Sequence, residues 1–178
     1  MEISEYASSI AKKRIGEDKV YNGSLENAPF KKNYFNLITM IDIIEHVRNP
    51  IEALLKAREY LNITTNSNGG GYCMITTPNT DSLSAKIMGK RWLHYNSEHL
   101  NYFNIKSMQK LSELTGFKII KYGTLLKTMR LNYMYFQLKE HNNKLLSDFV
   151  KYANYTPLIS KIDFPILSGD FYLILEKV

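Results

Sequence analysis

The sequence predicts an α/β fold on a mainly parallel sheet, because strand-like and helix-like stretches alternate up to residue 122. The stretch 35–41 is apolar almost throughout, which is typical of a strand covered on both faces. The last stretch, 170–178, alternates apolar and polar residues, and we expect it to pair antiparallel at one edge of the sheet. We interpret residues 1–178 as a single domain and 124–169 as an insertion between the last two strands, with one or two helices.

The helices are marked by their capping residues. Ser4 and Gly16 bound the first helix, and Asn49 followed by Pro50 begins the second. A short helix follows residue 80 and ends at Gly89, and the last is capped by Asn104 and stopped by Gly116. We expect seven apolar side chains of the second and last helices to face the core: Ile51, Leu54, Leu55, Leu61, Met108, Leu111 and Leu114.

The predicted strands lie between these helices and are separated by polar loops. The stretch 62–71 is a flexible polar loop, and 91–103 is an irregular loop rich in aromatic residues and histidine. The expected strands cover 19–23, 33–42, 72–77, 117–123 and 170–178.

Composition and charge narrow the classes of partner. The net charge is +6, but the lysines are scattered in pairs among acids, which favours a solvated surface over a nucleic-acid footprint. No apolar run approaches the roughly 20 residues that span a bilayer, and the first residues lack the pattern of a signal peptide. Cys73 is the one cysteine and lies in an apolar strand, so we expect a buried thiol and a cytoplasmic protein.

The stretch "ITMIDIIEHVRNP", residues 38–50, carries the strongest functional signal. Its apolar run stops at Ile41, and Asp42, Glu45 and His46 follow before the next helix begins. Polar groups just past the carboxyl end of a strand are typical of an α/β active site, because ligands bind there in open sheets.

The order of these pieces resembles class I S-adenosylmethionine-dependent methyltransferases of the type that acts on small molecules and biosynthetic intermediates. The resemblance is carried by a strand with a terminal acid, "EHV", a helix begun by proline, a glycine-rich loop, a strand ending "TPN", a tryptophan, "HL" and "GF". It implies a Rossmann-like sheet of order 3-2-1-4-5-7-6 with an antiparallel last strand, and methylation of an oxygen or nitrogen on a small acceptor.

The resemblance also implies residues that bind the cofactor S-adenosylmethionine. Glu2 matches the acid that takes the ribose hydroxyls, and Asp42 lies where relatives meet the methionine end of the cofactor. Ser24 stands where many relatives carry aspartate near the adenine, and Leu25 offers a backbone N–H and an apolar wall. A carboxylate near the positive sulfonium is electrostatically favourable.

Histidines and aromatic residues are the candidates for catalysis and acceptor binding. His46 is the first candidate for the general base that removes the acceptor's proton, and His99 is the second. His99, Trp92 and Tyr95 are expected to form a lid and acceptor pocket. The alternative readings are that His46 only caps the helix or bonds backbone, and that the loop is purely structural.

A divalent-metal site is a further alternative for this stretch. Quinone-biosynthesis O-methyltransferases carry Glu-x-x-Glu-His where this chain has Asp42-x-x-Glu45-His46. Asp42 has a shorter side chain than the glutamate found in those enzymes. Acids are also common at a helix start because they interact favourably with the helix dipole. We therefore assign no metal ligands from the sequence.

Measured against this family, the chain lacks the glycine-rich cofactor loop, together with the first strand, the first helix and most of the second strand. We therefore expect an N-terminally truncated methyltransferase that binds S-adenosylmethionine poorly and is inactive or weakly active. The alternative is a non-catalytic methyltransferase-like domain that acts as an oligomer or binds a partner. An uncovered sheet edge invites self-association, so a homodimer through that edge is also expected.

Overall fold

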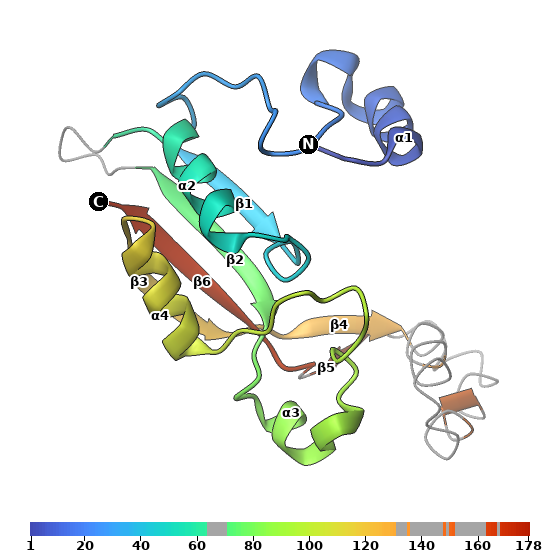
Figure 1. Ribbon diagram of the computed structural model, residues 1–178. Helices are drawn as coiled ribbons and strands as arrows, with labels where there is room; N and C mark the ends of the chain where they lie inside the picture. The colour runs from blue at the N-terminus through green and yellow to red at the C-terminus, as the bar shows by residue number, and fades with distance from the viewer. Residues whose placement is uncertain (64–70, 131–134, 136–147, 149, 152–162, 167) are drawn as a thin grey trace.

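The computed structural model describes residues 1–63, 71–130, 135, 148, 150–151, 163–166 and 168–178 (Figure 1). The predicted loop at 62–71 and the expected insertion helices lie largely outside these residues. The elements, in chain order, are α1 (Glu5–Ile15), η1 (Glu17–Lys19), β1 (Leu37–Ile41), α2 (Pro50–Tyr60), β2 (Tyr72–Pro78), α3 (Leu83–Met88), η2 (Gly89–Arg91), α4 (Ile105–Leu114), β3 (Phe117–Thr124), β4 (Lys127–Arg130), β5 (Asp163–Ile166) and β6 (Asp170–Lys177).

The helix starts are where the capping residues predict them. The Ser4 hydroxyl accepts the backbone N–H of Ala7, and the Asn49 side chain accepts those of the first turn of α2. Asn104 and Ser107 form a reciprocal capping box at α4. These short-range bonds satisfy N–H groups that a helix leaves without partners, which is why sequence alone located them.

The main sheet has the strand order β1-β2-β6-β3. Strands β1 and β2 are parallel, with Leu37 opposite Tyr72 and Ile41 opposite Thr76, while β6 runs antiparallel to both β2 and β3. This order reproduces the 4-5-7-6 half of the expected sheet and confirms the antiparallel last strand. The parallel pair brings the carboxyl ends of β1 and β2 to the same edge.

Helices α2 and α4 cover one face of this sheet (Figure 1). The core between them is built from both layers and includes Leu54, Met108, Cys73 and Leu173, each fully buried. Burial of Cys73 confirms the sequence prediction.

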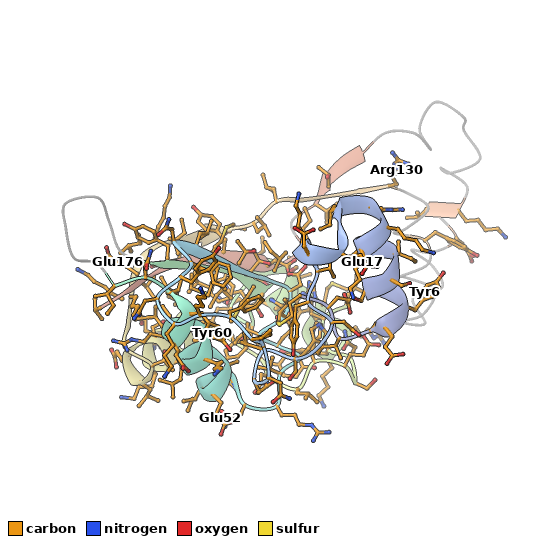
Figure 2. All side chains as sticks on the ribbon, turned by 90° about the horizontal axis from the view of Figure 1, so that it is seen from above. Tyr6, Glu17, Glu52, Tyr60, Arg130 and Glu176 are labelled. Carbon is orange, nitrogen blue, oxygen red and sulfur yellow. The ribbon has the colours of Figure 1, made fainter. Side chains whose placement is uncertain are left out.

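Three side chains expected in the core are exposed instead. Ile51, Leu55 and Leu114 are 39%, 46% and 55% exposed. The buried residues of α2 are Ala53, Leu54, Ala57 and Tyr60, so this helix turns two small alanines inward. Figure 2 shows Tyr60 within the molecule and Glu52 of the same helix at its outer rim. The apolar spacing predicted a helix correctly, but small residues at the contact decided its rotation.

The expectation that β1 is covered on both faces is wrong for the described residues. Met40 is buried in the same core cluster as residues of α2, whereas Leu37 and Ile41 are 55% and 51% exposed. Among the described residues, β1 has its ladder partners on β2 alone. The uncovered face leaves apolar side chains in solvent because no described helix packs there.

Two further differences concern strands. Residues 19–23 do not form a strand; they contribute one parallel bridge between Glu2 and Asn22. In the expected insertion, β4 and β5 pair antiparallel, with Lys127 opposite Ile166.

Within the described part of the chain, no helix is long and apolar enough to cross a membrane.

Candidate active site

Asp42 turns the chain away from the sheet at the carboxyl end of β1. Its φ of 51° lies in the left-handed region, which aspartate tolerates better than most residues because its short side chain bonds locally. Its backbone N–H donates to the carbonyl of Thr76, 3.0 Å away, and the Thr76 hydroxyl donates to its carboxylate at 2.9 Å. These bonds hold a carboxylate at the mouth of the β1–β2 pair, as the sequence predicts.

Lys127 connects Asp42 to a second carboxylate. Its ammonium lies 2.8 Å from Asp42 and 3.1 Å from Asp170, which is fully buried at the start of β6. Burial opposes the charge on Lys127, but the bonds to both aspartates outweigh it and raise the pKa of the ammonium. Lys127 therefore keeps its charge at neutral pH.

Asp170 has further partners from the aromatic loop and the turn before β6. The ring of His94 lies 3.5 Å from its carboxylate, and the Ser168 hydroxyl donates to the same oxygen. Burial alone would raise the pKa of Asp170, but the bonds from His94 and Ser168 and the charges of His94 and Lys127 lower it below its ordinary value.

The ionised state of Asp170 predicts acid-sensitive stability. A carboxyl with a lowered folded-state pKa stabilises the fold above its unfolded pKa, and this stabilisation is lost as pH falls towards the folded pKa. We expect the free energy of unfolding, measured in urea, to fall below about pH 4. The fall should be shallower in Asp170→Asn and unchanged in Asp81→Asn, which alters an exposed acid. A wild-type slope in Asp170→Asn would contradict this.

A second group forms beside the acids, from the β1–α2 loop and the aromatic loop. Glu45 is 2% exposed and accepts a hydrogen bond from the Thr77 hydroxyl at 2.9 Å. Burial raises the pKa of Glu45 more than its own backbone N–H and Thr77 lower it. The ring centroids of His46 and His99 are 4.7 Å apart, so the two predicted histidines do meet.

The ring nitrogens of the two histidines are in different environments. Nδ1 of His46 lies 2.9 Å from the carbonyl of Glu98 and, because a carbonyl only accepts, Nδ1 donates here; in the neutral imidazole the lone pair is then on Nε2. Nδ1 of His99 is buried without a hydrogen-bond partner. Burial, together with the nearby charge of His46, lowers the pKa of His99. Both imidazoles can therefore offer a lone pair to a proton or a metal ion.

The aromatic loop is held down by Trp92. Its ring is 1% exposed, and its indole N–H lies 3.2 Å from both the Ser84 hydroxyl and the Ser168 carbonyl. Tyr95 is 41% exposed and contacts the Trp92 ring edge-on at 5.2 Å. The geometry favours an anchoring role for Trp92 and leaves Tyr95 as the exposed ring; acceptor contact by either stays a prediction.

The residues predicted to bind nucleoside lie on the N-terminal segment. Glu2 joins Asn22 in a parallel bridge, and its carboxylate accepts the N–H of Ser4 at 2.8 Å. Ser24 donates to Glu26 and lowers the pKa of that carboxyl, while Leu25 packs against the core. The structure thus brings Glu2 and the turn at 22–25 together, as the family pattern implies, and their binding role stays a prediction.

Lys127, Asp170 and His94 are site residues that sequence reasoning missed. Lys127 lies in the stretch interpreted as an insertion, and Asp170 looks like an ordinary first residue of a strand. The sequence did contain one signal for Asp170. It is an acid at the start of the antiparallel last strand, and that strand begins beside the end of β2.

A surface hollow of about 620 Å³ lies at the other end of the sheet. Its charged groups are engaged: Arg58 bonds the carbonyls of Gly116 and Val178, and Lys177 bonds that of Leu61. We place the site at the carboxyl edge instead, because the acids and imidazoles meet there. The hollow is lined by Lys32, Asn33, Arg58, Glu59, Ile63, Glu176, Lys177 and Val178.

Comparison with solved structures shows the same fold in several methyltransferases. An S-adenosylmethionine-dependent methyltransferase from Thermotoga maritima, named as a possible histamine N-methyltransferase, is similar at 20% identity and a TM-score of 0.62, covering 99% of this chain and 72% of that one. A methyltransferase of the same dependence from Methanosarcina mazei is 14% identical, with a TM-score of 0.55 and coverage of 99% and 80%. The [4+2]-cyclase SpnF is 13% identical, with a TM-score of 0.57 and coverage of 98% and 63%.

The family comparison bears on the chain directly. No curated protein sequence matches it at a significant level. The family model described as "Methyltransferase domain" matches residues 1–122, which include Asp42, Glu45, His46 and His99. The chain therefore belongs to the methyltransferase-domain family and has the class I S-adenosylmethionine-dependent methyltransferase fold.

Proposed function

We propose that this chain methylates an oxygen or nitrogen on a small or biosynthetic acceptor. Family membership supports methyl transfer and implies S-adenosylmethionine as the cofactor. The observation that carries the assignment is the His46 ring, whose Nδ1 proton is held by the Glu98 carbonyl while Nε2 is left basic. A nucleophile with a proton to lose needs such a base.

Four of the residues present suit the cofactor chemically, although the family's glycine-rich cofactor loop is not among them. S-adenosylmethionine supplies an electrophilic methyl group on a positive sulfonium when it is bound. Asp42, 40% exposed in its side chain, offers a carboxylate for positive charge, and Glu2 offers one for ribose hydroxyls. Ser24 and Leu25 would line the adenine side. Lys127 already balances Asp42, so a cationic ligand would have to share that carboxylate.

The chain's own residues would then handle the acceptor and its proton. Nε2 of His46 would take the acceptor's proton while the acceptor's lone pair bonds the methyl carbon and the methyl–sulfur bond breaks, its electron pair staying on sulfur to leave a neutral thioether. His99 supports the first ring at 4.7 Å or replaces it as the base. Tyr95 and Trp92 shape the side of the pocket from the loop above, with Tyr95 exposed to meet the acceptor.

A test combines cofactor binding with turnover. S-adenosylmethionine is titrated by calorimetry, and release of S-adenosylhomocysteine is then measured with phenols, amines and carboxylic acids in turn. Because the family's glycine-rich cofactor loop is not present in this chain, we expect weak binding that weakens further in Asp42→Asn, and slow turnover with one class of nucleophile. Absence of binding, or binding without turnover on any class, would contradict the proposal.

A second candidate function is non-catalytic, as a homodimer or partner-binding module. It is favoured by the uncovered side of β1, where Leu37 and Ile41 are more than half exposed. Sedimentation velocity would show a dimer that Ile41→Lys dissociates, together with no cofactor binding. A monomer at all concentrations would rule out self-association through this side of β1.

A further inference from the structure

Glu45, His46 and His99 place one carboxylate and two imidazoles around a common point. One ligand atom from each lies within 4.8 Å of the others. Metal–ligand bonds of about 2.1 Å put ligand atoms about 3 to 3.5 Å apart, so the most widely spaced of these atoms would approach each other by about 1.3 to 1.8 Å around an ion.

The outer partners of these side chains match those of metal ligands. A ligating histidine almost always donates its second N–H to a carbonyl or carboxylate, and His46 does so to Glu98 at 2.9 Å. A ligating carboxylate is itself hydrogen-bonded, and Glu45 accepts from Thr77 at 2.9 Å. These contacts orient both groups without occupying the lone pair at Nε2 of His46.

One buried group in this cluster lacks a hydrogen-bond partner, and another lacks a counter-charge among the described residues. Nδ1 of His99 is buried with no hydrogen bond, which costs free energy unless a ligand meets it. Glu45 is 2% exposed, and no lysine or arginine of the described chain forms an ion pair with it. A bound cation would supply both the missing partner and the missing charge.

Asp42 does not belong to this set. Its two carboxylate oxygens are engaged by the Thr76 hydroxyl at 2.9 Å and by the Lys127 ammonium at 2.8 Å. Residues 42, 45 and 46 therefore do not form one ligand cluster. His99, and not Asp42, is the third residue beside Glu45 and His46. This exchange changes the metal preference from oxygen-seeking Mg²⁺ to ions that favour imidazole.

We propose that Glu45, His46 and His99 form a binding site for a divalent transition metal such as Zn²⁺. Two histidines and one carboxylate leave positions open for solvent or an acceptor oxygen. With an ion bound, His46 would serve as a ligand and not as the free base, and the chemistry supplied there would be polarisation of that oxygen. The site itself is independent of methyl transfer.

The test uses the full chain and Zn²⁺ alone, without cofactor or acceptor. Calorimetry is expected to show one Zn²⁺ per chain and weaker binding of Mg²⁺. Glu45→Gln and His99→Ala should each weaken Zn²⁺ binding at least tenfold, and Thr77→Val by about tenfold. Glu113→Gln, an exposed acid on α4, is the matched control and should bind as wild type.

Folding of each variant is checked by circular dichroism. X-ray absorption of wild type loaded with Zn²⁺ provides a readout that needs no variant, and it should show two imidazole ligands. Three results would overturn the site: no saturable binding, binding unchanged in both Glu45→Gln and His99→Ala, or binding lost in Asp42→Asn but kept in His99→Ala. Because no methyl donor is present, failure here leaves the methyl-transfer proposal standing.

Discussion

Lys127→Met is expected to lower the free energy of unfolding by about 3 kcal/mol. The ammonium lies 3.1 Å from Asp170, whose side chain is fully buried, and 2.8 Å from Asp42. Removing the cation leaves a buried carboxylate short of positive charge, which costs more than the pair itself contributes. Lys127 is 25% exposed, so we place the loss at the lower end of the range for buried pairs. Urea denaturation monitored by circular dichroism measures it.

The matched control is Lys110→Met, which removes a lysine paired with Glu113 at 3.6 Å where both side chains are about 70% exposed. Such a pair contributes about 0.5 kcal/mol or less. Asp170→Asn in the Lys127→Met background should recover part of the loss, because the uncompensated charge is gone. A Lys127→Met loss as small as that of the control would show that the cluster does not stabilise the fold.

His46→Ala is expected to lower turnover by about 10²- to 10⁴-fold, the range of a general base. The variant removes the Nε2 lone pair that the Glu98 contact leaves available. Turnover is measured with the best acceptor in the presence of a chelator, so that the base is tested without bound metal. Because His46 acts on the acceptor's proton, the affinity for S-adenosylmethionine should change little.

Two comparisons separate a catalytic role from a structural one. Free imidazole should restore part of the rate of His46→Ala, since it can enter the space left and accept the proton. Arg48→Ala changes an exposed residue of the same loop and should keep the wild-type rate. Equal turnover in His46→Ala and wild type would remove His46 from the mechanism and leave His99 as the base.

Local features of this protein were readable because they depend on neighbours in sequence. Ser4, Asn49 and Asn104 mark helix starts through hydrogen bonds that span three residues, and the apolar strands end where polar residues take over. The position of Asp42 at the end of β1 follows from this, as does its place beside β2, since parallel strands end at one edge. The order of elements also sufficed to predict the family.

Contacts between distant segments depended on tertiary packing. Lys127 reaches Asp42 across 85 positions of sequence, and no local pattern marks a lysine in an expected insertion as part of the site. The exposure of Leu55 and Ile41 likewise depends on which face of α2 and which face of the sheet is covered by another element.

The sequence by itself therefore determined the elements, their order and the edge at which polar groups gather, because these follow from short-range bonding and periodicity. Only the tertiary structure decided which of those groups meet. It paired Asp42 with Lys127 and brought His99 to Glu45 and His46, because long-range packing sets the loops in place and charge pairing then selects the partners.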